Sequence, residues 1–135
     1  MMRRRVLIVM LALAFAGCNP FAPSRSVEGS WVARQFKFSF ICLELRQNGD
    51  TITGTASAVT DGFLLYSGVP VTGEHPNVQF TVAATNTAPC CRQLAGTIFS
   101  GRQDSTDDIV GRYVGGDIRF EPGDVSVCAP IRNGP

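Results

Sequence analysis

The chain has 135 residues, a length that suits one domain, and its 44% apolar content against 17% charged residues excludes an intrinsically disordered protein. It carries 12 basic and 11 acidic residues, for a formal net charge of +1. This balance lacks the basic surplus that nucleic-acid binding requires. We therefore expect no nucleic-acid partner.

The N-terminus has the pattern of an export signal. Residues 1–5 contain three arginines, and residues 6–16 form an apolar run of eleven. Such a run is shorter than the roughly 20 residues that span a bilayer, but it suits the hydrophobic region of a signal peptide. Ordinary cleavage after Ala16 is one possible outcome, since Ala14-Phe15-Ala16 has the small-x-small pattern.

The stretch Ala16-Gly17-Cys18 resembles the lipobox of bacterial lipoproteins. This resemblance implies that residues 1–17 are a lipoprotein signal peptide and that lipidation occurs at Cys18. The protein would then lie in the bacterial cell envelope, bound to a membrane through this anchor, on the periplasmic or outer-membrane face. Five cysteines are an odd number for an exported chain, and assigning Cys18 to lipid leaves four that can pair.

The segment after the signal peptide has the composition of a linker. Residues 18–28 include two prolines and show no periodicity, so we predict a lipid-anchored linker. The folded domain is predicted over residues 29–128, with a C-terminal tail over 129–135. Loss of Arg3, Arg4 and Arg5 leaves nine basic residues against 11 acidic ones, a net charge of about −2 at neutral pH.

Alternation of apolar and polar residues predicts a series of short strands. The clearest unit is the hairpin around Asn48-Gly49-Asp50, and Asp61-Gly62 and Gly115-Gly116 are further two-residue turn signals. Strands are expected at 29–36, 38–46, 51–59, 63–72, 78–85, 92–100, 108–114, 117–121 and 125–128. No segment of the mature chain shows helical periodicity, so we predict essentially no helix.

Short sequential connections favour an up-and-down barrel over a sandwich. Glycines inside the predicted strands, such as Gly54 and Gly111, are typical of bulges and barrel corners. Closure also removes exposed strand edges. The predicted fold class is all-β: a small antiparallel up-and-down β-barrel of eight or nine strands.

Gly29-Ser30-Trp31, followed by Gly-Asp-Thr-Ile-Thr-Gly-Thr at 49–55, resembles the start of calycin barrels, the lipocalin and avidin group. The lipocalin likeness implies that Trp31 packs at the closed end of the barrel against an arginine, with Arg119 as first candidate and Arg112 as second. Biotin binding is not expected. The avidin pattern needs several tryptophans and a tyrosine where this chain has Ala56.

Four cysteines remain for the folded domain: Cys42, Cys90, Cys91 and Cys128. In an exported domain of this size they predict two disulfides. A bond between Cys90 and Cys91 would close a strained ring, so we expect each of them to have a different partner. One would pair with Cys42 and the other with Cys128, since strand parity brings all four toward one end of the barrel.

The sequence gives little support to a catalytic function. The single histidine, His75, has no second His or Cys at ligand spacing, and it is interpreted as a loop residue. Asp104, Asp107 and Asp108 could attract calcium, but they lack the spacing of a calcium loop and are interpreted as solvating a turn. We expect no enzyme, no cofactor and no metal site.

Two functions stay open. The barrel could hold a small apolar ligand, and the alternative is an envelope protein-interaction or inhibitor module with a packed interior and no ligand inside. In the first case the inward side chains of the strands would line the cavity that holds the ligand. These are Leu43, Leu45, Ile52, Val69, Val71, Phe80, Val82, Ile98, Ile109 and Tyr113.

Overall fold

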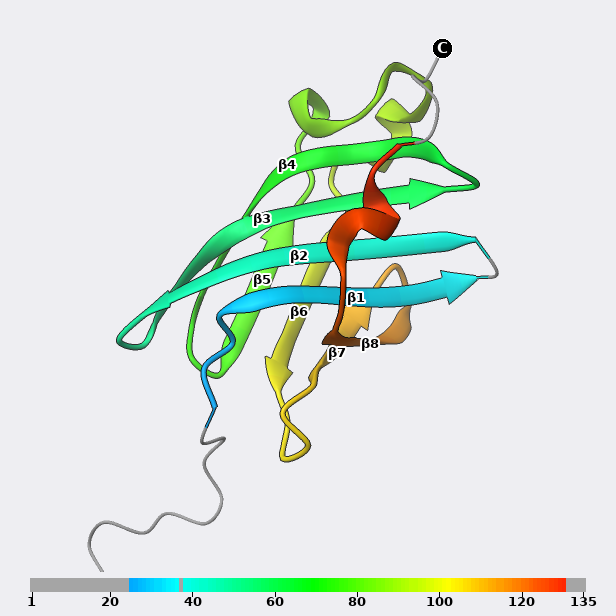
Figure 1. The fold of residues 1–135 in the computed structure, drawn as a ribbon. Helices are drawn as coiled ribbons and strands as arrows, with labels where there is room; N and C mark the ends of the chain where they lie inside the picture. The colour runs from blue at the N-terminus through cyan, green and yellow to red at the C-terminus, as the bar shows by residue number, and fades with distance from the viewer. Residues whose placement is uncertain (1–24, 37, 131–135) are drawn as a thin grey trace, which may run out of the picture.

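A computed structural model describes residues 25–36 and 38–130 and shows an eight-stranded closed barrel (Figure 1). Each strand pairs antiparallel with the next along the chain, and β8 pairs with β1. The strands are β1 (Gly29–Phe36), β2 (Ser39–Asn48), β3 (Thr51–Thr60), β4 (Phe63–Glu74), β5 (Asn77–Thr81), β6 (Ile98–Gln103), β7 (Ile109–Tyr113) and β8 (Gly116–Pro122). The predicted all-β up-and-down barrel is confirmed.

Three predicted strands differ from the structure. The strand predicted over 78–85 ends at Thr81, as β5. The segment predicted as a ninth strand is a short 3₁₀ helix, η3 (Val125–Cys128). Most of the chain between β5 and β6 forms η1 (Ala84–Asn86) and η2 (Pro89–Leu94), so β6 begins six residues later than expected. Pro89 opens η2 at a position where its missing N–H costs nothing. The expectation of no helix was wrong for these three turns.

The β2–β3 hairpin is the longest regular ladder. Its pairs run without interruption from Ser39–Thr60 to Asn48–Thr51. Gly49 has a φ of 61°, which glycine adopts without steric cost, and this allows the tight turn. Gly54 packs so closely against β2 that a Cβ there would overlap the carbonyl oxygen of Glu44.

The connections between strands lie at the two ends of the barrel. We call the end where β1 begins the entry end; it also carries the Gly49–Asp50, His75–Pro76 and Asp104–Asp108 connections. The other, called the opposite end, carries the β1–β2, β3–β4 and β7–β8 turns together with η1 and η2.

Trp31 closes the entry end. It is buried, and its Nε1–H donates to the carbonyl of Val27 at 2.7 Å. The implied contact with Arg119 is wrong, because the Arg119 side chain lies on the outer surface, where it bonds Asp108 at 2.8 Å. The second candidate, Arg112, is also exposed and lies beside Asp117 at 3.8 Å. The inward position of Trp31 and the outward positions of both arginines follow from strand alternation.

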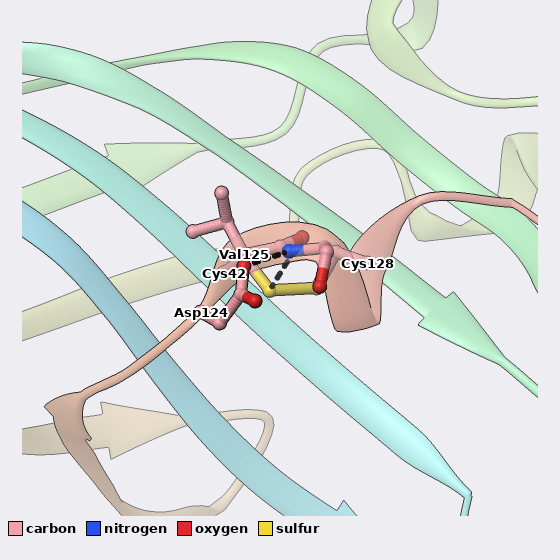
Figure 2. The surroundings of a disulfide bond; sticks show 5 residues. Cys42, Asp124, Val125 and Cys128 are labelled. Carbon is pink, nitrogen blue, oxygen red and sulfur yellow. Dashed lines mark hydrogen bonds between the residues drawn. A yellow bond between two sulfur atoms is a disulfide. The ribbon is translucent and has the colours of Figure 1, made fainter.

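All four cysteines predicted to pair are in disulfides, but the predicted pairing is wrong. Cys42 bonds to Cys128, and Cys90 bonds to its neighbour Cys91. Figure 2 shows the first bond, with η3 lying across the outside of β2. Cys42 points away from the barrel interior. It can therefore reach Cys128 in η3, which crosses the outer face of the sheet, whereas Cys90 and Cys91 lie in the β5–β6 connection.

The disulfide belongs to a second, smaller hydrophobic cluster on the outer face. Cys42, Val59 and Cys128 form its buried part, and Phe40 and Val125 pack against them. Asp124 is the N-cap of η3, and its side-chain carboxylate accepts a hydrogen bond from the backbone N–H of Ser126 at 2.9 Å (Figure 2). This hydrogen bond lowers the pKa of the Asp124 carboxyl.

Cys18, the predicted signal peptide and most of the predicted linker fall outside the described residues, as does most of the predicted tail. Within residues 25–36 and 38–130, no helix has the length and apolar character that crossing a membrane requires.

Candidate functional site: a cleft at the barrel seam

Nine of the ten side chains predicted to line a ligand cavity belong to one buried cluster inside the barrel. The exception is Ile98, which is 59% exposed on the outer surface. The prediction that Ile98 lines the interior was therefore wrong. In the predicted strand 92–100 the inward and outward positions were exchanged. Phe99, and not Ile98, occupies the inward position. A slip of one residue exchanges the two faces of a strand.

The interior side chains fill the barrel. Leu43, Ile52 and Ile109 are 0% exposed, and so are Phe99 and Phe120. A void large enough for water would leave accessible surface on the side chains around it, so these positions have no such void beside them. Three of the aromatic rings pack in sequence. The ring centroids of Phe80 and Phe99 are 5.4 Å apart in a tilted arrangement, and those of Phe99 and Phe120 are 5.2 Å apart, edge to face. The centre of the barrel is a packed core.

Two tyrosines cross the interior toward the opposite end. Tyr66 from β4 and Tyr113 from β7 join hydroxyl to hydroxyl at 2.8 Å. Burial raises the pKa of both phenols above the usual value, so both are neutral at neutral pH. Two neutral hydroxyls have two O–H donors, and the bond between them uses one. The pair therefore keeps one O–H donor that bonds no other described residue.

The barrel is closed weakly between its first and last strands. β1 and β8 pair only at Trp31–Pro122 and Val32–Glu121, near the entry end. Beyond Val32 no ladder pair joins the two strands, although each remains paired with its other neighbour. A register shift in the β1–β2 ladder between Arg34 and Phe36 marks a bulge, and bulges bend the strand that contains them.

The early end of this ladder leaves two unpaired backbone edges. The Gly123 N–H donates to the Ser30 carbonyl at 3.1 Å, so the backbone groups of Ser30 face β8. Hydrogen bonding alternates along antiparallel strands, so Val32 and Arg34 face the same way. Arg34 and Arg119 would be the next bonded pair in this register, but they do not pair. Their N–H and C=O groups face the gap.

The gap is a cleft of about 1050 Å³, which we call the seam cleft. Its inner part, toward the barrel axis, includes Leu65, Leu94, Tyr113 and Ile118, and the exposed Gln35 also lines the cleft. Its outer part reaches Val32, Phe40 and Val127 beside η3. The Arg34 guanidinium lies 5.3 Å from the Phe40 ring centroid, a cation–π distance. The seam cleft thus combines apolar side chains and free backbone groups with charged side chains such as Asp117 and Glu121.

The β4–β5 junction provides a contrast. It also pairs at only two positions, Val71–Phe80 and Thr72–Gln79, and a smaller cleft of about 520 Å³ lies beside it. Here, however, Asn86 Nδ2 donates to the Gly68 carbonyl at 3.2 Å, and Thr87 bridges to Tyr66. Residues of the β5–β6 connection therefore cover the β4 edge, whereas no hydrogen bond of this kind covers the edges of the seam cleft within residues 25–36 and 38–130.

The polar residues singled out in the sequence have structural partners. His75 is half-buried, and its Nε2 lies 2.8 Å from the side-chain oxygen of the buried Gln103. Arg119 bonds both Asp104 and Asp108, and a hydrogen bond from the Thr106 hydroxyl lowers the pKa of Asp104. Asp107 lies 3.6 Å from Arg25. In the part of the chain that the structure describes, no group of His, Cys, Asp or Glu side chains is arranged to hold a metal ion.

Comparison with protein-family models, with curated proteins and with solved structures found no match to this chain.

Proposed function

We propose that the protein is an interaction module that binds an extended segment of another protein in the seam cleft. The segment would add as a strand to the free edge of β1 or of β8. The observation that carries this proposal is that β1–β8 pairing stops after Val32–Glu121, which leaves Arg34 and Arg119 without a partner across the seam.

Strand addition suits both the backbone and the walls of the cleft. Exposed sheet edges bind extended peptides through main-chain hydrogen bonds, and neighbouring pockets select alternate side chains. Val32 and Phe40 on the outer side, and Leu65 and Ile118 on the inner side, offer apolar surface for those side chains. A partner segment with apolar residues at alternate positions would match this arrangement.

The packed interior supports an interaction module over a carrier. Ligand-carrying barrels enclose space that their own side chains do not fill, whereas here Ile52, Ile109 and Phe99 are 0% exposed. If Cys18 is lipidated, as the lipobox resemblance implies, the partner is another protein of the bacterial envelope.

The proposal can be tested by site-specific photo-crosslinking in the native host. A photoreactive residue at Gln35, which lines the cleft, should give a crosslinked product of defined mass, whereas one at Thr53, exposed on β3, should not. In that background Arg34→Pro removes the free N–H, and Arg34→Ala removes only the side chain. We expect Arg34→Ala to keep the product and Arg34→Pro to lose it. A product that persists with Arg34→Pro would refute strand addition at β1.

A second candidate rests on the spare hydroxyl donor of the tyrosine pair. Tyr113 lines the inner part of the cleft, so a small apolar molecule with an oxygen acceptor could dock there. A fluorescent fatty acid should then bind the wild type, and Tyr113→Phe should weaken binding roughly tenfold, as expected for about 1–1.5 kcal/mol from one hydrogen bond. Equal binding by both proteins would reject this candidate.

A further inference from the structure

The bond between Cys90 and Cys91 has no evident role in stability. A disulfide stabilises a fold mainly by closing a loop and so restricting the unfolded chain, and the effect grows with loop length. Cys42 and Cys128 are 86 residues apart, whereas Cys90 and Cys91 are neighbours. A bond between adjacent residues restricts the unfolded chain very little. Its presence requires another explanation.

The two disulfides also differ in their accessibility. Cys90 is exposed on the β5–β6 connection, and Cys91 is buried beneath it with 7% exposure. Cys42 and Cys128 are 2% and 6% exposed, and they lie between β2 and η3 within the outer hydrophobic cluster. A thiolate must reach a sulfur atom to exchange with a disulfide, so Cys90 is the accessible point of attack.

The surrounding loop is held by hydrogen bonds that do not depend on the disulfide. The Ala88 N–H donates to the Leu65 carbonyl at 2.9 Å, and the Gly96 N–H donates to the Val82 carbonyl at 2.7 Å. The Cys91 N–H donates to the Ala88 carbonyl at 2.9 Å. Opening the bond between the sulfurs therefore leaves the loop attached at both sides.

We propose that Cys90–Cys91 is a redox-active disulfide that accepts two electrons from a protein dithiol, while Cys42–Cys128 is the structural bond. One thiolate of the dithiol attacks Sγ of Cys90, which forms a mixed disulfide and releases Cys91 as the leaving thiolate. The second thiol of the dithiol then attacks the mixed disulfide and releases Cys90. The dithiol becomes a disulfide, and Cys90 and Cys91 take up the two protons as thiols.

Graded reduction of the native full-length protein tests the proposal. The protein is incubated with increasing dithiothreitol, then alkylated and analysed by peptide mass spectrometry. Labels on Cys90 and Cys91 should appear at a dithiothreitol concentration at least tenfold lower than labels on Cys42 and Cys128. Labelling of all four cysteines together, or of Cys42 and Cys128 first, would overturn the proposal.

Two single variants test the point of attack. Cys91→Ser leaves the exposed Cys90 thiol, and Cys90→Ser leaves the buried Cys91 thiol. With oxidised glutathione as the probe, we expect Cys91→Ser to form the mixed disulfide at least fivefold faster. Equal rates, or a faster Cys90→Ser, would contradict attack at Cys90. The thermal midpoint of Cys90→Ser/Cys91→Ser should match the wild type, and a marked decrease would assign the bond a structural role instead.

Discussion

At the scale of single residues, the hydroxyl bond between Tyr66 and Tyr113 is the most informative polar contact of the interior. Tyr66 is 0% exposed, so its hydroxyl has no access to water if the partner is lost. A buried polar group without a partner costs about 1–3 kcal/mol, whereas replacing both members by apolar groups is close to neutral.

We therefore expect Tyr113→Phe to lower the free energy of unfolding by about 1–3 kcal/mol. The double variant Tyr66→Phe/Tyr113→Phe should recover most of this loss, because no orphaned hydroxyl remains. Urea denaturation of the two variants and the wild type measures the difference. A double variant less stable than Tyr113→Phe would contradict this account of the pair.

The same tyrosines predict how stability depends on pH. Burial raises the pKa of Tyr66 above about 10, the usual value for a tyrosine phenol, and it shifts the pKa of Tyr113 in the same direction. Above pH 10 the unfolded chain releases these protons while the folded chain keeps them, so stability present at neutral pH is lost as the pH rises. Urea denaturation between pH 8 and 11.5 should show this decrease in the wild type. A decrease of equal size in Tyr66→Phe/Tyr113→Phe would assign the effect to other groups.

At the scale of elements, local turn chemistry made most of the barrel predictable. The Gly49–Asp50 and Asp61-Gly62 turns lie between strands as expected, because a hairpin turn and its alternating flanks are adjacent in sequence. The β5–β6 connection was not predictable in this way. Its apolar residues cover the opposite end through tertiary contacts, and alternation alone could not show that the strand begins only at Ile98.

The packed interior predicts an asymmetric response to a larger side chain. Leu45 is 3% exposed inside the barrel, whereas Ile98 is 59% exposed outside. Leu45→Trp should lower the free energy of unfolding by about 1–3 kcal/mol through overpacking. The matched variant Ile98→Trp should stay within about 0.5 kcal/mol of the wild type, as is usual for surface changes. If Leu45→Trp were as stable as Ile98→Trp, the interior would have to contain unfilled space.

At the scale of the whole molecule, the Cys42–Cys128 bond ties the C-terminal segment to the outside of the barrel (Figure 2). Because it joins residues 86 positions apart, it restricts the unfolded chain strongly. Cys42→Ser/Cys128→Ser should lose about 2–4 kcal/mol of unfolding free energy, measured in urea. An unchanged stability would show that the outer cluster holds η3 without the bond.

The sequence could not predict the Cys42–Cys128 bond or the seam cleft, for the same physical reason. Both depend on where the two ends of the chain meet after folding. Neither the reach of Cys128 across β2 nor the early end of β1–β8 pairing leaves a signal in local periodicity. The closing strands were recognisable, but alternation alone predicts neither the bulge near Gln35 nor the point where the ladder between these strands ends.

The open seam, on which the proposed function depends, can be measured directly by amide hydrogen exchange resolved by NMR. The amides of Val32 and Glu121 pair across the seam and should be protected, while those of Arg34 and Arg119 face the cleft and should exchange at least a hundredfold faster. A bound partner segment should slow exchange at Arg34 or Arg119 and leave Val32 unchanged. Protection of Arg34 and Arg119 equal to that of Val32 in the free protein would mean that the barrel is fully closed, and the account of the seam cleft would be wrong.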